Sequence, residues 1–236
     1  MIGPEGAVQA GWLKSEDMMK PSIHAMKLTL WAMAVAVGHL VSPTQAAAAT
    51  ETAVIAGGCF WCVEANFESV PGVKSVVSGF TGGTLKDPTY DDVSHSETGH
   101  YEAVEIKFDP AKVSYATLID LFLHSTDVVD AGGQFCDRGK SYRSAIFASA
   151  AQAPLAQAAI DQAAAKLGQH IVTPILPLQK FYPADEYHQD YYKGSSIILT
   201  RRGPKTKAGA YEFYRNACGR DARVQELWGV SAQFLH

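Results

Sequence analysis

Apolar and polar positions divide residues 51–148 into short elements of two kinds. Apolar runs with alternation or with turn-forming residues at their ends predict strands at 51–56, 73–80, 101–108 and 142–148. Apolar residues at helical spacing predict one helix over 59–70 and a second after Ser114, a suitable N-cap. The resulting order, β-α-β-β-α-β, predicts an α+β fold on the ferredoxin-like, split βαβ plan.

The remaining segments predict connections and a C-terminal extension. Residues 81–100 and 127–141 lack periodicity and contain many turn formers, so both are expected to be loops. An Ala-rich helix is expected over 154–168, a strand over 171–178 and a short helix over 185–193. No repeat or second boundary interrupts this order, so residues 50–236 are expected to form a single catalytic domain.

The N-terminal segment has the pattern of a secretory signal peptide. Residues 28–42 contain no charged side chain, Lys27 precedes them, and Ala46-x-Ala48 offers a small-residue cleavage site. The apolar run is shorter than the roughly 20 residues of a membrane span, although a retained anchor is the alternative. We therefore expect residues 1–49 to be a signal peptide with an upstream extension, removed on export. The mature protein would be periplasmic or secreted, with no membrane segment.

Composition and charge narrow the classes of function. The chain has 236 residues, 47% of them hydrophobic, which is typical of a globular protein with a core. The net charge of -4, with no basic run, makes a nucleic-acid partner improbable. Four cysteines are too few to be the main scaffold of such a domain, so each is a candidate for chemistry.

Cys59 is the strongest candidate for a reactive group. It follows Gly57-Gly58 where a strand turns into a helix, and a thiolate at a helix N-terminus has a lowered pKa. With Cys62 it also forms a C-x-x-C pair, which is compatible with a structural disulfide, half of a zinc site or a thioredoxin-type dithiol. Zinc would need further paired ligands, whereas the other two cysteines are isolated. The large residues between Cys59 and Cys62 are unlike thioredoxin and suit the wall of an apolar pocket.

A series of motifs carries a resemblance to one family. In order they are GGCFWCVE at 57–64, GFTGG at 79–83, DPTY at 87–90, TGHYEAVEI at 98–106, D-x-G-x-x-YRSAIF at 137–147 and FYPADEYHQDYY at 181–192. Over about 130 residues the chain resembles the A-type peptide methionine sulfoxide reductases. The resemblance implies reduction of methionine S-sulfoxide, in proteins and as the free amino acid, with repair of oxidised proteins as the outcome.

The resemblance also implies a role for each matching residue. These are Cys59 as nucleophile, Glu102 as proton donor, Tyr90 and Tyr142 as phenols that bind the sulfoxide oxygen, Asp137 as an organising carboxylate, Phe60 and Trp61 as the slot for the methyl group, and His188 and Tyr191 as pocket support. No metal or organic cofactor is implied. The electron donor would be a thioredoxin-like dithiol protein, and the enzyme is expected to be a monomer.

The cysteine that resolves a Cys59 sulfenic acid is left open by the sequence. Cys62, Cys136 and Cys218 are all candidates, and Cys136 stands where the family usually has Asn. We favour Cys218, because a mobile C-terminal tail would let it reach Cys59. Two rival functions also remain: a disulfide oxidoreductase that uses Cys59 and Cys62, and a non-enzymatic binding module whose four thiols are all paired.

Overall fold

The sheet at the centre of the fold confirms the α+β prediction. The computed structural model describes residues 49–236, so the predicted signal peptide lies outside the described residues. One six-stranded sheet has the order β7-β6-β1-β3-β2-β8. Its strands are β1 (Glu51–Gly57), β2 (Val73–Thr81), β3 (Tyr101–Phe108), β6 (Ser144–Ala148), β7 (Ile175–Pro177) and β8 (Tyr182–Pro183). All neighbours are antiparallel except β6 and β7.

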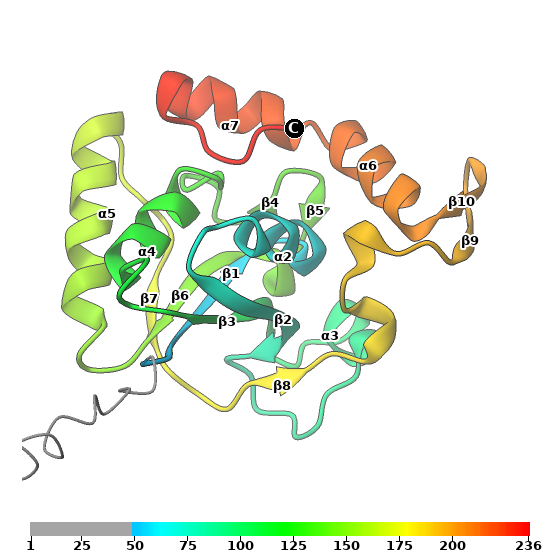
Figure 1. Cartoon of the computed structure of the whole chain (residues 1–236), viewed down its shortest axis with the longest axis horizontal. Coiled ribbons are helices and arrows are strands. Elements are labelled where there is room, and N and C mark those ends of the chain that lie inside the picture. The colour runs from blue at the N-terminus through cyan, green and yellow to red at the C-terminus, as the bar shows by residue number, and fades with distance from the viewer. Residues whose placement is uncertain (1–48) are drawn as a thin grey trace, which may run out of the picture. The chain divides into compact units, whose positions relative to one another are not determined.

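Three helices pack on one face of this sheet and bury its main core (Figure 1). They are α2 (Phe60–Glu68), α4 (Tyr115–Leu123) and α5 (Ala153–Leu167). The predicted N-cap of α4 is confirmed, because the Ser114 side chain accepts a hydrogen bond from the Thr117 amide. A smaller cluster around Phe147 covers the opposite face of the sheet.

Two predicted segments differ from the structure. The expected loop at 81–100 contains a six-residue helix, α3 (Tyr90–His95), which has a capping box between Thr89 and Asp92. Its one buried residue, Val93, gives no apolar stripe that could have predicted a helix. The expected helix at 185–193 is two 3₁₀ turns, Glu186–His188 and Tyr191–Lys193, because Asp190 between them has a left-handed backbone with φ 53°.

The C-terminal extension is folded, which corrects the expectation of a mobile tail. It forms a hairpin of β9 (Ile197–Thr200) and β10 (Gly203–Thr206), then α6 (Lys207–Ala217), α7 (Arg220–Trp228) and a 3₁₀ turn at Gly229–Ser231. Trp228 is buried and its indole Nε1 donates to the Thr126 carbonyl at 3.2 Å. Figure 1 shows α6 and α7 following one another in orange and red. Buried apolar side chains therefore fix the segment that carries Cys218.

A small hairpin completes the architecture next to the extension. Strands β4 (Gly133–Gln134) and β5 (Asp137–Arg138) pair with each other, and a 3₁₀ turn at Lys140–Tyr142 leads into β6. The buried Gln134 side chain bonds both the amide and the carbonyl of Asp127, which ties the hairpin to the loop after α4. Within residues 49–236, no helix has the length and apolar character needed to span a membrane.

Candidate active site

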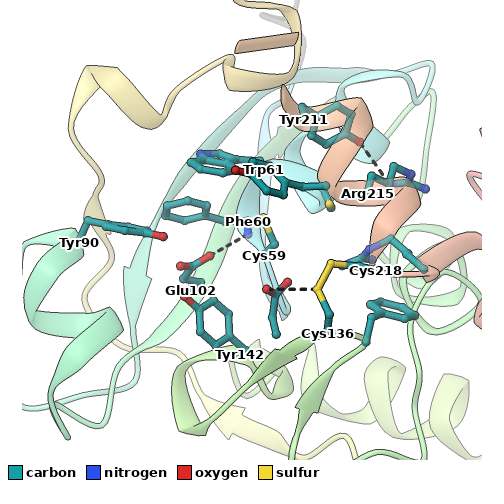
Figure 2. A pocket seen from close by; sticks show the side chains of 15 residues that line it. Cys59, Phe60, Trp61, Tyr90, Glu102, Cys136, Tyr142, Tyr211, Arg215 and Cys218 are labelled. Atoms are coloured by element: carbon teal, nitrogen blue, oxygen red, sulfur yellow. Dashed lines mark hydrogen bonds between the residues drawn. A yellow bond between two sulfur atoms is a disulfide. The ribbon is translucent and has the colours of Figure 1, made fainter. Parts of the chain in front are cut away.

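One cavity of about 180 Å³ collects every residue predicted to be catalytic, to resolve the sulfenic acid or to bind the methyl group (Figure 2). The predicted residues among its lining are Cys59, Phe60, Trp61, Tyr90, Glu102, Asp137, Tyr142 and Cys218. They come from the start of α2, from α3, β3 and β5, from the 3₁₀ turn before β6, and from the junction of α6 and α7. Residues that are far apart in sequence, from Cys59 to Cys218, thus meet at one place. The two other cysteines, Cys62 and Cys136, line the same cavity.

The position of Cys59 depends on the turn before it. Gly58 has φ 81°, and a Cβ built on it would lie 2.6 Å from the Gln134 Cβ. Only glycine fits such a backbone at that spacing. The turn places Cys59 at the N-cap of α2, as the sequence predicts, with its side chain partly exposed.

Cys59 and Cys62 behave as a pair of thiols. A hydrogen bond from Cys59, opposed by burial and assisted by Arg220 and Arg215, lowers the pKa of Cys62 to about 6. The same hydrogen bond, together with burial and the neighbouring charges, raises the pKa of Cys59 well above its ordinary value. The prediction of a lowered pKa for Cys59 is therefore wrong for Cys59 itself, because the low pKa belongs to Cys62. Cys59 becomes the thiolate when its proton passes to Cys62.

Glu102 has the properties of a proton donor. It is 2% exposed on β3, and its Oε2 accepts a hydrogen bond from the Phe60 amide at 3.0 Å. Burial, opposed by that hydrogen bond, raises the pKa of Glu102 to about 8, and the charge of Asp137 adds to the rise. The carboxyl therefore holds its proton at neutral pH while lying at the first turn of the helix that carries Cys59.

Two phenols and a second carboxylate surround Glu102. Burial is the main reason why the pKa of Tyr90 rises to about 12. Burial is also the main reason why the pKa of Tyr142 lies well above its ordinary value. The two hydroxyls affect each other's pKa, and the Tyr142 hydroxyl also lowers the pKa of Glu102. Burial likewise raises the pKa of Asp137, which Arg220 opposes. Both phenols stay protonated at neutral pH and can donate to an oxygen in the cavity.

Stacked aromatic rings form the apolar wall. Trp61 stacks on Tyr191 with ring centroids 3.7 Å apart, and the His188 ring stacks on Tyr90 at 4.3 Å. Phe60 is 1% exposed and packs against Phe80. His188 and Tyr191 thus support the wall from behind rather than lining the cavity. Such a surface suits a methyl group.

Cys136 and Cys218 form a disulfide on the cavity side opposite Glu102 (Figure 2). Their Cα atoms are 5.0 Å apart although 82 residues separate them in sequence. Cys136 is exposed, and its Sγ lies 3.8 Å from Asp137 Oδ1. Cys59 and Cys62 are free thiols, so the binding module with all four thiols paired is contradicted.

Sequence reasoning missed five residues of the lining. They are Phe135, Tyr211, Tyr214, Arg215 and Arg220. Arg215 is buried and its Nη2 donates to Asp221 at 2.7 Å and to the Phe234 carbonyl at 2.6 Å. The available signal was the run RNACGRD, in which one arginine stands on each side of Cys218.

Two clusters of potential metal ligands occur among residues 49–236, and in each of them ligand atoms already bond other protein groups. In Cys136–Asp137–Cys218 the two sulfurs are bonded to each other. In the other cluster, Glu68 and Asp190 both pair with Lys193 at 2.8 Å, while Glu64 accepts from the Asp190 amide and Ser78. These groups stabilise the packing of α2 on the 3₁₀ turns.

Comparison with known proteins decides the family. The family model described as peptide methionine sulfoxide reductase matches residues 51–217. The chain belongs to this family. It is 48% identical over 203 residues to peptide methionine sulfoxide reductase MsrA 2 of Caulobacter vibrioides, covering 86% of this chain and 97% of that protein. It is 46% identical to MsrA 2 of Rhizobium meliloti over 187 residues, covering 79% of this chain and 87% of that protein.

A solved structure agrees with this assignment to the methionine sulfoxide reductases. Methionine sulfoxide reductase A of Corynebacterium diphtheriae superposes with a TM-score of 0.60 at 31% identity. The match covers 68% of this chain and 85% of that one. The sulfur, carboxyl and phenol groups described above thus lie in the fold of a reductase.

The protonated Glu102 of this reductase has a measurable effect on stability. Its pKa rises from 4.5 to about 8 on folding, so between these values the folded state holds a proton that the unfolded state releases. The free energy of unfolding should therefore fall as pH rises through this window, by up to about 1.4 kcal/mol per pH unit from this group. In Glu102→Gln that part of the slope should vanish in urea unfolding at pH 5.5, 6.5 and 7.5. Glu105→Gln, on the same strand, is the control, and parallel curves for wild type and Glu102→Gln would contradict the assignment.

Proposed function

We propose that this chain reduces methionine S-sulfoxide, protein-bound or free, to methionine. The observation that carries the proposal is the meeting of the free Cys59 thiol and the proton-holding Glu102 at one cavity beside an aromatic wall. The S epimer follows the A-type resemblance and the rule of one enzyme per sulfoxide epimer. Repair of oxidised proteins is the expected outcome.

The first step is attack of the Cys59 thiolate on the sulfoxide sulfur. The attack forms a bond between the Cys59 sulfur and the substrate sulfur, and the substrate oxygen takes a proton from Glu102. The resulting hydroxyl group then passes from the substrate sulfur to the Cys59 sulfur as the sulfur–sulfur bond breaks, which leaves a sulfenic acid on Cys59 and releases the thioether. One thiol and one sulfoxide become one sulfenic acid and one thioether, a two-electron exchange. The Tyr90 and Tyr142 hydroxyls would donate hydrogen bonds to the oxygen, and Asp137 would keep the proton on Glu102 by its charge.

The methyl group fixes the orientation of the substrate. With the oxygen facing Glu102 and the phenols, the methyl group would lie against Phe60 and Trp61, where no polar partner is needed. A sulfoxide of the opposite hand would place its oxygen against these rings and lose the donated hydrogen bonds. Loss of such bonds is the main source of discrimination between stereoisomers in a site of this kind.

A relay of disulfides would regenerate Cys59. We assign Cys218 as the thiol that condenses with the sulfenic acid, releasing water and forming a Cys59–Cys218 disulfide. Attack by Cys136 on the Cys218 sulfur then frees Cys59 and forms the Cys136–Cys218 disulfide. That pair includes an exposed sulfur, which a thioredoxin-like dithiol protein could reduce while becoming a disulfide itself.

A test of the reaction needs only the purified protein and a chemical reductant. With dithiothreitol, the protein should convert the S epimer of a methionine sulfoxide peptide to methionine and leave the R epimer unchanged. Consumption of neither epimer by the folded protein would overturn the proposal.

Disulfide exchange at Cys59 and Cys62 is the second candidate, because these two thiols hydrogen-bond each other. It requires that Cys62→Ser lose insulin-reducing activity and that Glu102→Gln have no effect. The reductase proposal requires a loss of sulfoxide reduction in Glu102→Gln.

Further features of the protein complete the proposal. We infer that the core follows the split βαβ plan, supported by the position of β3 between β1 and β2. We also infer export to the periplasm or exterior as a monomer, with the signal pattern of residues 26–48 as support. N-terminal sequencing of exported protein should begin close to Ala49, and a sequence beginning at Met1 or Met26 would contradict cleavage.

A further inference from the structure

Arg220 lines the cavity together with the three cysteines that the proposed relay uses. It is the first residue of α7, two positions after Cys218, and it is 2% exposed. Its guanidinium is therefore buried within the protein instead of facing bulk solvent. A buried guanidinium needs hydrogen bonds or ring contacts that offset its lost hydration, so the contacts of Arg220 indicate which parts of the protein it positions.

The first contact leads to Cys59. Arg220 Nη2 donates to the Gly57 carbonyl at 2.9 Å, two residues before Cys59, and Nη1 donates to the Ser125 carbonyl at 3.4 Å. Gly57 is the last residue of β1, so the bond joins the C-terminal extension to the strand that presents the nucleophile.

The second contact leads to Cys136. The guanidinium lies over the Phe135 ring with 4.2 Å to the centroid. Phe135 and Cys136 are the two turn residues between the paired Gln134 and Asp137. Phe135 has φ 56°, a backbone conformation that a bulky residue keeps only when its surroundings hold it. The stacked guanidinium is one such surrounding group.

We propose that Arg220 is a positioning residue that holds Cys136 and Cys218 in register with Cys59 for disulfide exchange. The Arg220 side chain bonds the residue two positions before Cys59 and stacks on the residue just before Cys136. Arg220 itself follows Cys218 by two positions in the chain. Exchange between thiols requires sulfurs in close alignment, and a displacement of about 1 Å can cost up to about 10²-fold in rate. The inference rests on the proposed function for the direction of the relay, and on the contacts alone for the role of Arg220.

The experiment separates the relay from the sulfoxide chemistry. Fully reduced protein receives one equivalent of either methionine S-sulfoxide or hydrogen peroxide, which by itself oxidises the Cys59 thiolate to a sulfenic acid with release of hydroxide. Dimedone trapping follows the lifetime of the sulfenic acid, and peptide mapping follows the Cys136–Cys218 disulfide. In Arg220→Gln the sulfenic acid should persist at least about tenfold longer with either oxidant. Arg220→Lys should fall between wild type and Arg220→Gln, since it keeps the charge without the planar fork.

A matched control separates positioning from general stability. Arg223 is on the same helix, but its guanidinium bonds Asp127 at 2.7 Å and Glu226 at 2.9 Å instead of Gly57 and Phe135. Arg223→Ala should leave the lifetime of the sulfenic acid within about twofold of wild type. Equal slowing in Arg223→Ala, or no slowing in Arg220→Gln, would overturn the inference.

A second variant covers the case in which Arg220→Gln does not fold. Phe135→Leu keeps an apolar turn residue and removes the ring under the guanidinium, so the relay should slow severalfold with both oxidants. An unchanged relay in Phe135→Leu would then overturn the inference. In a third outcome, the sulfoxide would yield no sulfenic acid in the wild-type protein, while peroxide would still show slower exchange in Arg220→Gln. That outcome would refute the proposed function and leave the inference about Arg220 standing.

Discussion

Replacing Cys59 with serine will stop the formation of methionine from methionine S-sulfoxide. Serine keeps the size of the side chain but does not form an anion near neutral pH, so the attack on sulfur loses its nucleophile. We expect a loss of about 10³-fold or more in kcat/KM with dithiothreitol as reductant. The measurement is the release of methionine from an S-sulfoxide peptide.

Cys62→Ser is the matched control for this prediction. It alters the partner thiol but leaves the nucleophile, and the reaction should continue with a shifted pH dependence, because the titration of Cys59 depends on its interaction with Cys62. Comparable activity in Cys59→Ser and wild type would remove Cys59 from the reaction.

Replacing Cys218 with serine will limit the enzyme to one turnover when a thioredoxin-like protein is the reductant. The Cys59 sulfenic acid would form with release of one methionine per chain, but neither the Cys59–Cys218 nor the Cys136–Cys218 disulfide could follow. The measurement is the amount of methionine per chain, first without reductant and then with the dithiol protein. Recycling should be abolished while the first methionine remains.

Cys136→Ser separates the two stages of the relay. We expect it to stop at a Cys59–Cys218 disulfide, which non-reducing peptide mapping identifies. Full multiple turnover in Cys218→Ser would contradict the role of Cys218 and transfer it to Cys62 or Cys136.

The catalytic end of the cavity was predictable because its residues lie in short local motifs. Gly57-Gly58-Cys59 and the alternating strand around Glu102 both have patterns that a sequence displays, and the structure places them as neighbours. Ser114 was predictable as an N-cap for the same reason. The lowered pKa of Cys62 was not, because it depends on a hydrogen bond from Cys59, on burial and on two arginines that are distant in sequence.

The C-terminal end was predicted incorrectly because its order comes from long-range contacts. The expectation of a mobile tail came from the resemblance, because many members of the family carry a cysteine in a C-terminal tail, and Cys218 stands close to the C-terminus. The structure anchors residues 195–236 through Trp228 and Arg220, whose partners lie 95 or more residues away, and through buried Arg215, which bonds Asp221 and the Phe234 carbonyl. Buried charged side chains are rare, and only their paired contacts reveal them.

This anchoring changes how the relay operates. A tail would carry Cys218 to Cys59 by diffusion, whereas the docked helix junction places it at the cavity in the disulfide-bonded structure. The turn that carries Cys136 is contacted by Arg220, whose guanidinium lies over the Phe135 ring. Small displacements of side chains and of the two-residue turn would then be sufficient for exchange.

The most direct measurement is a thiol map of fully reduced protein after one equivalent of methionine S-sulfoxide, quenched with an alkylating reagent. The account predicts one equivalent of methionine, a disulfide between Cys136 and Cys218, and alkylated Cys59 and Cys62. A map with no methionine formed, or with a disulfide between Cys59 and Cys62, would contradict it.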